Sequence, residues 1–338
     1  MIRKDIGKRL AEGRQMERAR HQAEDVKKLG TLRAGNSGVM DEDGNVAGSC
    51  HRIAYLRSVG IEVDPPDDSL LVMFQVGTAN ETIVYNDLIH TAAEGEVIKR
   101  EEEIPTRWMT SNGTPVTGRP DMVLGHNVPT VSERSGVDGS QFIPELLLEL
   151  KSVASVWTTR SVLFDQEPKL AHLIQACHYM WQLGNIDGRL IYKQYGLQAV
   201  PDFAQKFFPK EGDDNAEYLE YNSQGKVKAV RPFEIVYELR LIKGTLEFRV
   251  EGNSSWIRTV ITTDAIRRYY EFVSEMGSGK KLGPVPETID YSGKEKSYSN
   301  CSYCPLSSIC KEVKKEKSAT KQFDKWIEKV VDFTGSRR

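Results

Sequence analysis

The sequence predicts an α/β fold. Three segments, 96–105, 116–124 and 146–153, combine apolar alternation with flanking Gly, Asn and Pro clusters, which is typical of strands. A helical pattern over 169–183 then leads into a further strand at 189–195. The chain has 338 residues, of which 39% are hydrophobic and 28% charged, so it can bury a substantial core.

The sequence pattern of about the first 90 residues is mainly helical. Residues 1–34 alternate basic and acidic side chains with few large apolar ones, which predicts one or two exposed helices. Residues 35–48 are rich in Gly, Asp, Asn and Ser and predict a connector. A short helix over 50–60 and a longer one over about 69–90 follow, separated by Pro65-Pro66.

The later segments predict insertions around a second set of elements. A polar connector at about 125–144 predicts an insertion or a long hairpin tip, and residues 196–230 predict an irregular or inserted region. The turn Lys243-Gly244 predicts a hairpin between strands 235–240 and 245–250, and a helix is expected over 264–276. We therefore expect three parts, which are a basic helical segment with its connector (1–48), a core (49–310) and a basic helical tail (311–338).

The net charge of −2 is distributed unevenly along the chain. Residues 1–34 carry ten Lys and Arg against five Asp and Glu, and residues 311–338 carry nine against five. The two ends of the chain are therefore basic and the part between them is acidic. An acidic centre can hold divalent metals and basic ends can hold phosphates, although solvated helical faces explain the basic ends equally well. The apolar runs are too short to cross a bilayer and the basic N-terminus lacks a secretory apolar stretch, so we expect a cytoplasmic protein without a membrane partner.

The cysteines predict a metal centre. Cys301, Cys304 and Cys310 form a C-x2-C-x5-C pattern, which is compact enough for three thiolates to converge on one centre. Cys50, at the start of a predicted helix, is a good candidate for the fourth ligand, whereas Cys177 lies inside an apolar helical pattern. Disulfides are disfavoured by the odd cysteine count in a cytosolic chain. The spacing fits both zinc and an iron–sulfur cluster.

Carboxylates at two strand ends predict a second site. Asp121 opens one predicted strand, and Glu149-Leu150-Lys151 ends the next. Residues two apart share a face of a strand, so Glu149 and Lys151 project together on the face that alternation predicts to be exposed, while Leu150 packs into the core. If the two strands pair, Asp121 and Glu149 can bind Mg²⁺ or Mn²⁺ and leave Lys151 to orient or activate a water. The alternative for such a Glu–Lys pair is a surface ion pair.

The helix over 169–183 carries two polar-tipped residues on one face. Gln175 and Tyr179 are four residues apart in an otherwise apolar helix, where a core position would favour an aliphatic side chain. His172 and His178 flank Gln175, although single histidines more often occupy helix surfaces or satisfied core positions. Gln175 and Tyr179 are therefore candidates for a site.

Taken together, these motifs resemble those of the RecB-family nucleases in the PD-(D/E)XK superfamily. The carrying residues are Gly118-Arg119-Pro120-Asp121, Glu149-Leu150-Lys151, Gln175-x3-Tyr179 and the four cysteines named above. The resemblance is greatest to the iron–sulfur branch, which includes CRISPR-associated RecB-like exonucleases and the AddB nuclease domain. It implies a restriction-endonuclease-like core, a central mixed sheet flanked by helices, whose helical terminal segments are joined at a structural [4Fe–4S] cluster.

The resemblance also implies roles for individual residues. Asp121, Glu149 and the Leu150 carbonyl would hold Mg²⁺ or Mn²⁺, while Lys151 helps the attacking water. Gln175 and Tyr179 would support catalysis or contact DNA beside it. Independently of the resemblance, Arg119 and Arg160 are candidates for contacts with DNA phosphates near the site. Arg107 and Lys193 are further candidates for phosphate contacts, and Trp108 and Trp157 for base stacking.

One motif departs from the family. A His followed by Glu is usual in the helix before the strands, and this chain has Asn80-Glu81 there. Asn80 can offer a carbonyl oxygen but is a poorer ligand, so Glu81 is the alternative metal ligand. The other interpretation of Glu81 is an ordinary exposed helix residue.

Two functions are expected from these residues. The first is a metal-dependent DNA exonuclease or flap-cutting nuclease acting on single-stranded or end-containing DNA in recombination, replication or repair. The second, motivated by Asn80, is a DNA-binding or scaffold module of the same fold that is catalytically weak or inactive. No G-x4-G-K-[ST] motif occurs, so unwinding would need a partner such as a helicase or recombination protein.

Overall fold

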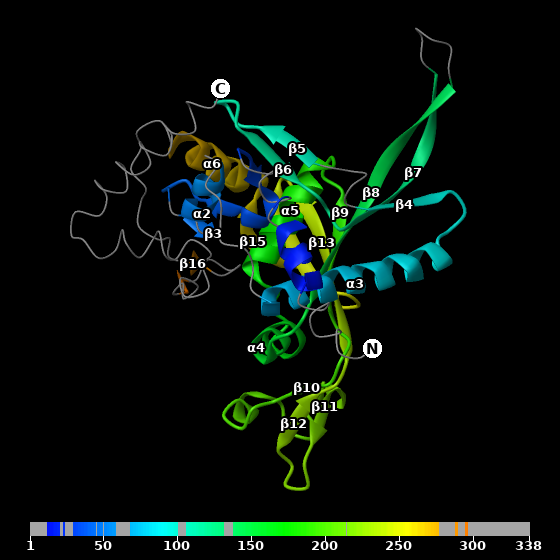
Figure 1. Cartoon of the computed structure of the whole chain (residues 1–338), viewed down its shortest axis with the longest axis vertical. Coiled ribbons are helices and arrows are strands. Elements are labelled where there is room, and N and C mark those ends of the chain that lie inside the picture. The colour runs from blue at the N-terminus through cyan, green and yellow to red at the C-terminus, as the bar shows by residue number, and fades with distance from the viewer. Residues whose placement is uncertain are drawn as a thin grey trace, which may run out of the picture. The chain divides into compact units, whose positions relative to one another are not determined.

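The computed structural model describes residues 12–20, 23, 30–44, 46–49, 51–58, 68–100, 106–131, 138–213, 215–276, 288–289 and 295–296. Figure 1 labels many of the elements in these ranges. The chain divides into two compact units, each assembled from separate segments. The first comprises Met1–Val76, Arg107–Gly118 and Asp264–Arg338, and the second comprises Gly77–Thr106 and Arg119–Thr263.

The second unit is built on a seven-stranded mixed sheet of order β15-β14-β13-β9-β8-β7-β4. The β8–β9 pair is parallel and the other neighbours are antiparallel. The strands are β4 (Glu96–Arg100), β7 (Met122–Val131), β8 (Asp138–Ser152), β9 (Asp187–Gln194), β13 (Phe233–Ile242), β14 (Thr245–Val250) and β15 (Ile257–Thr262). The predicted mixed sheet is therefore confirmed.

A helical crossover makes the parallel pair possible, because parallel neighbours cannot be joined by a tight turn. The chain leaves β8, passes through α4 (Val156–Thr159) and the π-helical turn η3 (Arg160–Phe164), and returns along α5 (Leu170–Gln182) to β9. The apolar face of α5 is buried against the sheet, including Leu173 and Ile174. The predicted helix at 169–183 is thus present.

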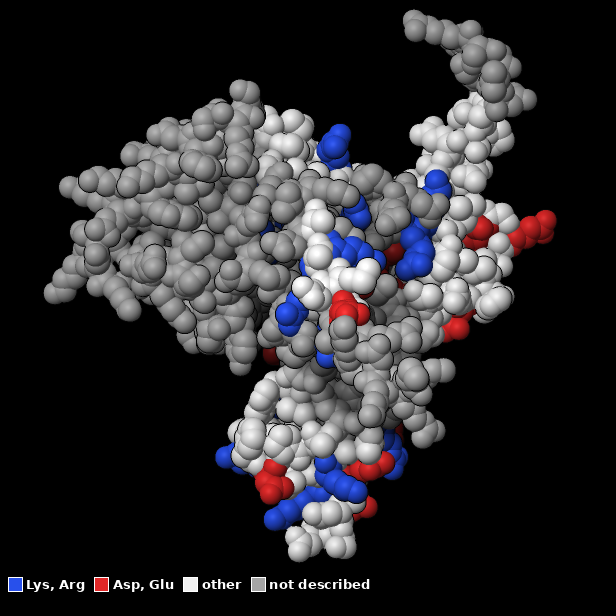
Figure 2. Space-filling model, viewed as in Figure 1, with Lys and Arg blue, Asp and Glu red and all other residues white. Residues whose placement is uncertain are grey.

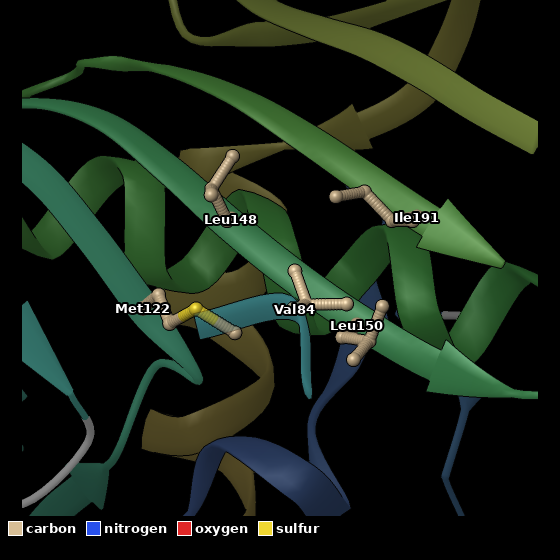
Figure 3. Close-up of a cluster of buried hydrophobic side chains, with 5 residues drawn as sticks. All are labelled: Val84, Met122, Leu148, Leu150 and Ile191. Carbon is tan, nitrogen blue, oxygen red and sulfur yellow. The ribbon is translucent and has the colours of Figure 1, made fainter. Parts of the chain in front are cut away.

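The opposite face of the sheet is covered by α3 (Asp68–Thr91), whose residues from Gly77 onward belong to the second unit. Val84 of α3 packs against residues of three neighbouring strands, as Figure 3 shows. These residues are Met122, Leu148, Leu150 and Ile191. Burying them removes a continuous apolar surface from water, and this hydrophobic burial is the main interaction that holds the layers together.

Several strand boundaries differ from the prediction. The expected strand over 116–124 is two strands, β6 (Pro115–Gly118) and β7, because Pro120 has no N–H to donate to a ladder. The predicted connector at 125–144 is a long hairpin whose arms continue β7 and β8, with residues 132–137 outside the described ranges. The hairpin of β13 and β14 is confirmed, with Lys243 and Gly244 at positive φ of 50° and 79°.

The sequence predicts an irregular or inserted region over 196–230, but the structure has regular elements there. It holds a three-stranded sheet of order β10-β12-β11. Its elements are β10 (Gln198–Ala199), η4 (Gln205–Phe207), η5 (Ala216–Tyr218), β11 (Leu219–Tyr221) and β12 (Val227–Val230). Strands of two to four residues are too short to show an alternation in the sequence. The turn between β11 and β12 is closed by the Asn222 side chain, which accepts hydrogen bonds from Gln224 N and Lys226 N.

The first unit contains small sheets and helices. The expected connector at 35–48 instead contains an antiparallel pair, β2 with β3, and Tyr269 of α6 donates a hydrogen bond to the Asn36 carbonyl beside it. The elements are β1 (Leu32–Arg33), η2 (Ala34–Asn36), β2 (Gly38–Met40), β3 (Val46–Gly48), α2 (His51–Ser58), β5 (Thr106–Met109), β6, α6 (Thr263–Glu275), β16 (Thr288–Ile289) and β17 (Glu295–Lys296). Residues 12–20 are helical. Among the helices of the described ranges, none combines the length and apolar character that a membrane crossing requires.

Candidate active site

The site is built where β7 begins and β8 ends. Met122 lies opposite Leu148 in the antiparallel register, so Asp121, one residue earlier, lies across from Glu149. The main-chain N–H of Leu150 donates a hydrogen bond of 2.7 Å to the Asp121 carboxylate. The pairing of these two strands, on which the predicted carboxylate pair depends, is therefore present.

Strand alternation separates the charges from the core. Leu148 and Leu150 are 5% exposed and face α3, whereas Glu149 and Lys151 face the other side of the sheet. That side was expected to be exposed, and the expectation is wrong for Glu149, which is fully buried. The reason is the parallel β8–β9 pair, whose crossover helix α5 covers this face.

The contacts of Glu149 are uneven. The Lys151 ammonium lies 2.5 Å from Oε1 of Glu149. Oε2 is buried and has no hydrogen-bond partner within the described structure. A buried ionised oxygen without a partner costs several kcal/mol, on the order of the penalty for burying an uncompensated charge. The Glu149–Lys151 pair is thus a buried site rather than the surface ion pair that was the alternative.

Burial and charge shift the pKa values of the three groups. Burial and the neighbouring Asp121 carboxylate raise the pKa of Glu149 to about 8, against the opposing effect of Lys151. Burial also raises the pKa of Asp121, partly offset by Lys151 and the Leu150 N–H. Burial alone would lower the pKa of Lys151, but the attraction of Glu149 and Asp121 raises it to about 12. Lys151 is therefore a cation and the carboxylate pair retains a proton near neutral pH.

A second polar group adjoins Lys151. Tyr192 lies beside Lys151 in the parallel register, and its hydroxyl accepts a 3.0 Å hydrogen bond from Lys169 N. The same hydroxyl is 2.9 Å from Nδ1 of His172 on α5. Burial and the charges of Lys151 and Lys169 lower the pKa of His172 well below its ordinary value, so the ring that shares this hydrogen bond with Tyr192 is neutral.

Sequence reasoning missed Tyr192. The signal in the sequence is an aromatic hydroxyl on the strand that follows the carboxylate strand and its helix along the chain. His172 was interpreted there as a surface or core histidine, and the structure places it against this tyrosine. The face of the sheet that carries Lys151 thus continues into a hydrogen-bonded Tyr–His pair.

Gln175 and Tyr179 share one face of α5, as their spacing predicts. The Gln175 side-chain amide donates a 3.2 Å hydrogen bond to the Tyr179 hydroxyl. Their roles at DNA stay predictions. Between them, Cys177 is fully buried and carries no disulfide, and His178 is buried with its pKa lowered to about 3 by desolvation.

Asn80 and Glu81 of α3, the two candidate metal ligands of this helix, interact with the site in different ways. The Asn80 amide donates a 2.6 Å hydrogen bond to the Ser152 hydroxyl, which ties α3 to the end of β8. The carboxylate of Glu81 acts on the site through its charge, because it raises the pKa of both Glu149 and Lys151. That Asn80 or Glu81 ligates a metal stays a prediction.

Arg107 of β5 is exposed, and the other three predicted basic contacts have different surroundings. Arg119 is exposed two residues before Asp121. Arg160 is half-buried on η3, 3.4 Å from Asp165 and with its guanidinium 5.6 Å from the centre of the Phe207 ring. Lys193 is 2.7 Å from Glu234. The four predicted cluster ligands, Cys50, Cys301, Cys304 and Cys310, lie outside the described residues.

The site has the donors of a hard cation. Within the described ranges, no group of three or more His, Cys, Asp and Glu side chains is placed to hold a metal. The residues present are two facing carboxylates, one of which has a buried oxygen without a partner. Carboxylate oxygens are the ligands that Mg²⁺ and Mn²⁺ take in proteins, usually with main-chain carbonyls and waters completing the shell. Asp121 and Glu149 fit such an ion.

Comparison with known proteins identifies no family. No family model and no curated protein matches the chain. Among solved structures, the crystal structure of SSO0001 is similar at a TM-score of 0.33 and 14% identity, over 72% of this chain and 71% of that chain.

The shifted pKa of Glu149 predicts the pH dependence of stability. In metal-free protein the folded state holds a proton on Glu149 up to pH about 8, whereas the unfolded chain releases it near the ordinary value of 4.5. The free energy of unfolding should therefore fall by about 1 kcal/mol between pH 7 and 8. His172 and His178 have lowered pKa values, so their contribution is lost at lower pH, as pH falls through 6.5 and below.

Urea denaturation at pH 7 and 8 measures this loss. Glu149→Gln should remove the fall, because the amide has no proton to release between pH 7 and 8. Glu247→Gln, which removes a carboxylate paired with Arg240 on the β13–β14 hairpin, is the matched control and should keep the fall. Equal slopes for Glu149→Gln and wild type would contradict the assignment.

Proposed function

We propose that this chain is a metal-dependent DNA exonuclease of the RecB type in the PD-(D/E)XK superfamily. The observation that carries the proposal is the Asp121–Glu149–Lys151 group on two adjoining strands, with the free Oε2 of Glu149 buried beside it. A protein leaves an acidic oxygen buried and unpaired at a cost, and such sites are commonly functional.

The residues that would hold the metal are Asp121, Glu149 and the Leu150 carbonyl. A bound Mg²⁺ or Mn²⁺ would polarise a phosphodiester oxygen and lower the pKa of a bound water. The Leu150 N–H fixes the Asp121 carboxylate, so this ligand is oriented before the ion arrives. Glu149 is held from the other end by Lys151.

Lys151 acts as a cation. The attraction of Glu149 and Asp121 raises the pKa of Lys151 to about 12, which favours the ammonium over the free amine. Its ammonium can donate to the attacking water and stabilise the negative charge that develops on the phosphate in the transition state. The chemistry suits an anionic diester, because the site supplies a fixed positive charge beside the two ligands.

Cleavage of end-labelled single-stranded and double-stranded DNA with Mn²⁺ tests the proposal. Glu149→Gln should lose the ligand charge and Lys151→Met the transition-state charge, and each should lower the rate about a hundredfold or more. The control Glu247→Gln should cut as wild type does. Cleavage by Glu149→Gln at the wild-type rate would place the activity elsewhere or in a contaminant.

The second candidate function is a DNA-binding or scaffold module without hydrolysis. Its support is Asn80, which stands where the family has His and is engaged by Ser152. The same assay separates the two functions, because a binding module retains DNA in the presence of Mn²⁺ without cutting it. Asn80→His would then be the variant to test for gained cleavage.

We also propose that Cys50, Cys301, Cys304 and Cys310 hold a [4Fe–4S] cluster. The proposal rests on the cysteine spacing and on the family resemblance. A cluster held by Cys50 and by the three cysteines from Cys301 onward would close a loop that spans most of the chain. Closing so long a loop would greatly restrict the unfolded chain, so the cluster would stabilise the fold.

Anaerobically purified protein should be brown and contain about four irons per chain. Cys304→Ala should lose iron and unfold at a lower temperature, whereas Cys177→Ala should keep its iron because Cys177 is buried in α5. A colourless protein with one zinc per chain would replace the iron–sulfur assignment by a zinc site.

A further inference from the structure

Three aromatic rings lie exposed together in the second unit, beside the crossover from β8 to α5. Trp157 of α4 is 44% exposed, Phe203 is 67% exposed and Phe207 of η4 is 42% exposed. The ring centre of Trp157 is 6.3 Å from that of Phe203 and 5.5 Å from that of Phe207. We call these three residues the aromatic platform.

The platform is fixed from below. The Thr159 hydroxyl donates a 2.8 Å hydrogen bond to the side chain of Gln198, which joins α4 to β10. Phe164 packs edge-on against the buried Phe208 at 5.6 Å, which joins η3 to the end of η4. These contacts therefore hold in place the backbone segments that carry the exposed rings.

Two cations lie beside one ring of the platform. The guanidinium of Arg160 and the ammonium of Lys206 lie 5.6 and 5.0 Å from the centre of the Phe207 ring. Aromatic side chains with adjacent Arg and Lys are the combination that single-stranded nucleic acids require, because the rings stack on bases while the cations contact phosphates.

Charge alone does not explain binding here. In Figure 2 the end of the second unit that carries the β10–β12 sheet has basic and acidic side chains interspersed. Asp165 is 3.4 Å from Arg160, and Asp202 accepts from Gln205 next to the platform. A polyanion gains little from such a mixed surface, so stacking has to supply much of the affinity.

The platform also lies close to the candidate active site along the chain. Trp157 follows Lys151 by six residues, which limits their Cα separation to about 20 Å. We propose that Trp157, Phe203 and Phe207 bind unpaired nucleobases of a single strand and present that strand to the carboxylate site. This rests on the proposed nuclease function for its second half, and it adds these three rings as a binding site for unpaired bases.

Binding without cleavage tests the stacking half independently. Fluorescence anisotropy of a labelled oligothymidylate in EDTA should show binding by wild type that weakens about fivefold or more in Phe203→Leu. Phe203→Tyr should restore binding, because it keeps the ring, whereas leucine keeps only the apolar volume. Ile257→Ala, which removes a 41% exposed apolar side chain from β15, is the control and should bind as wild type does.

An abasic oligonucleotide with the same phosphates separates bases from charge. It should bind wild type and Phe203→Leu equally weakly. Lys206→Gln should weaken the binding of both oligonucleotides. Its control is Lys243→Gln, which changes an exposed lysine at the turn of the β13–β14 hairpin.

The outcomes distinguish this inference from the nuclease proposal. Equal oligothymidylate binding by wild type, Phe203→Leu and Trp157→Ala overturns the platform, whether or not the protein cuts DNA, and leaves a protein partner as the remaining class of occupant. Platform-dependent binding by a protein that does not cut DNA with Mn²⁺ overturns the nuclease function and keeps the stacking site. Platform-dependent binding together with slower cleavage of single strands by Phe203→Leu supports both.

Discussion

The buried carboxylate of Glu149 is the constraint on which the rest of the site depends. A carboxylate under a helix has to be neutralised by a proton, an ammonium or a metal, because its ionised form is too costly without one. Lys151 neutralises one oxygen and leaves the other without a partner. Burial and the neighbouring Asp121 carboxylate outweigh the effect of Lys151 and raise the pKa of Glu149 to about 8.

The fold creates this constraint through the parallel step between β8 and β9. Parallel strands need a crossover, and the crossover helix α5 covers the face that the charges occupy. On the opposite face, Leu148 and Leu150 pack with Val84 of α3, so the strand cannot shift by one residue without burying its charges in that core. Packing on one face thus fixes the charged groups on the other.

Much of this could be predicted from the sequence, because it depends on local patterns. The alternation around Glu149 gave its shared face with Lys151, the Gln175–Tyr179 spacing gave a helix face, and Lys243-Gly244 gave a hairpin. What failed depended on tertiary partners. Burial of Glu149 requires knowing that β9 is parallel, the β10–β12 sheet is made of strands too short to show a period, and the break at Pro120 assigns β6 and β7 to different sheets.

Binding of Mn²⁺ tests the central claim most directly, namely that Asp121 and Glu149 form a site for a divalent cation. Calorimetry at pH 8 should find one ion bound by wild type, with affinity at least about tenfold weaker in Asp121→Asn and in Glu149→Gln and unchanged in Glu247→Gln. Affinity that is the same in all four proteins, or an absence of binding by wild type, would contradict it and leave the buried Glu149–Lys151 pair a structural feature.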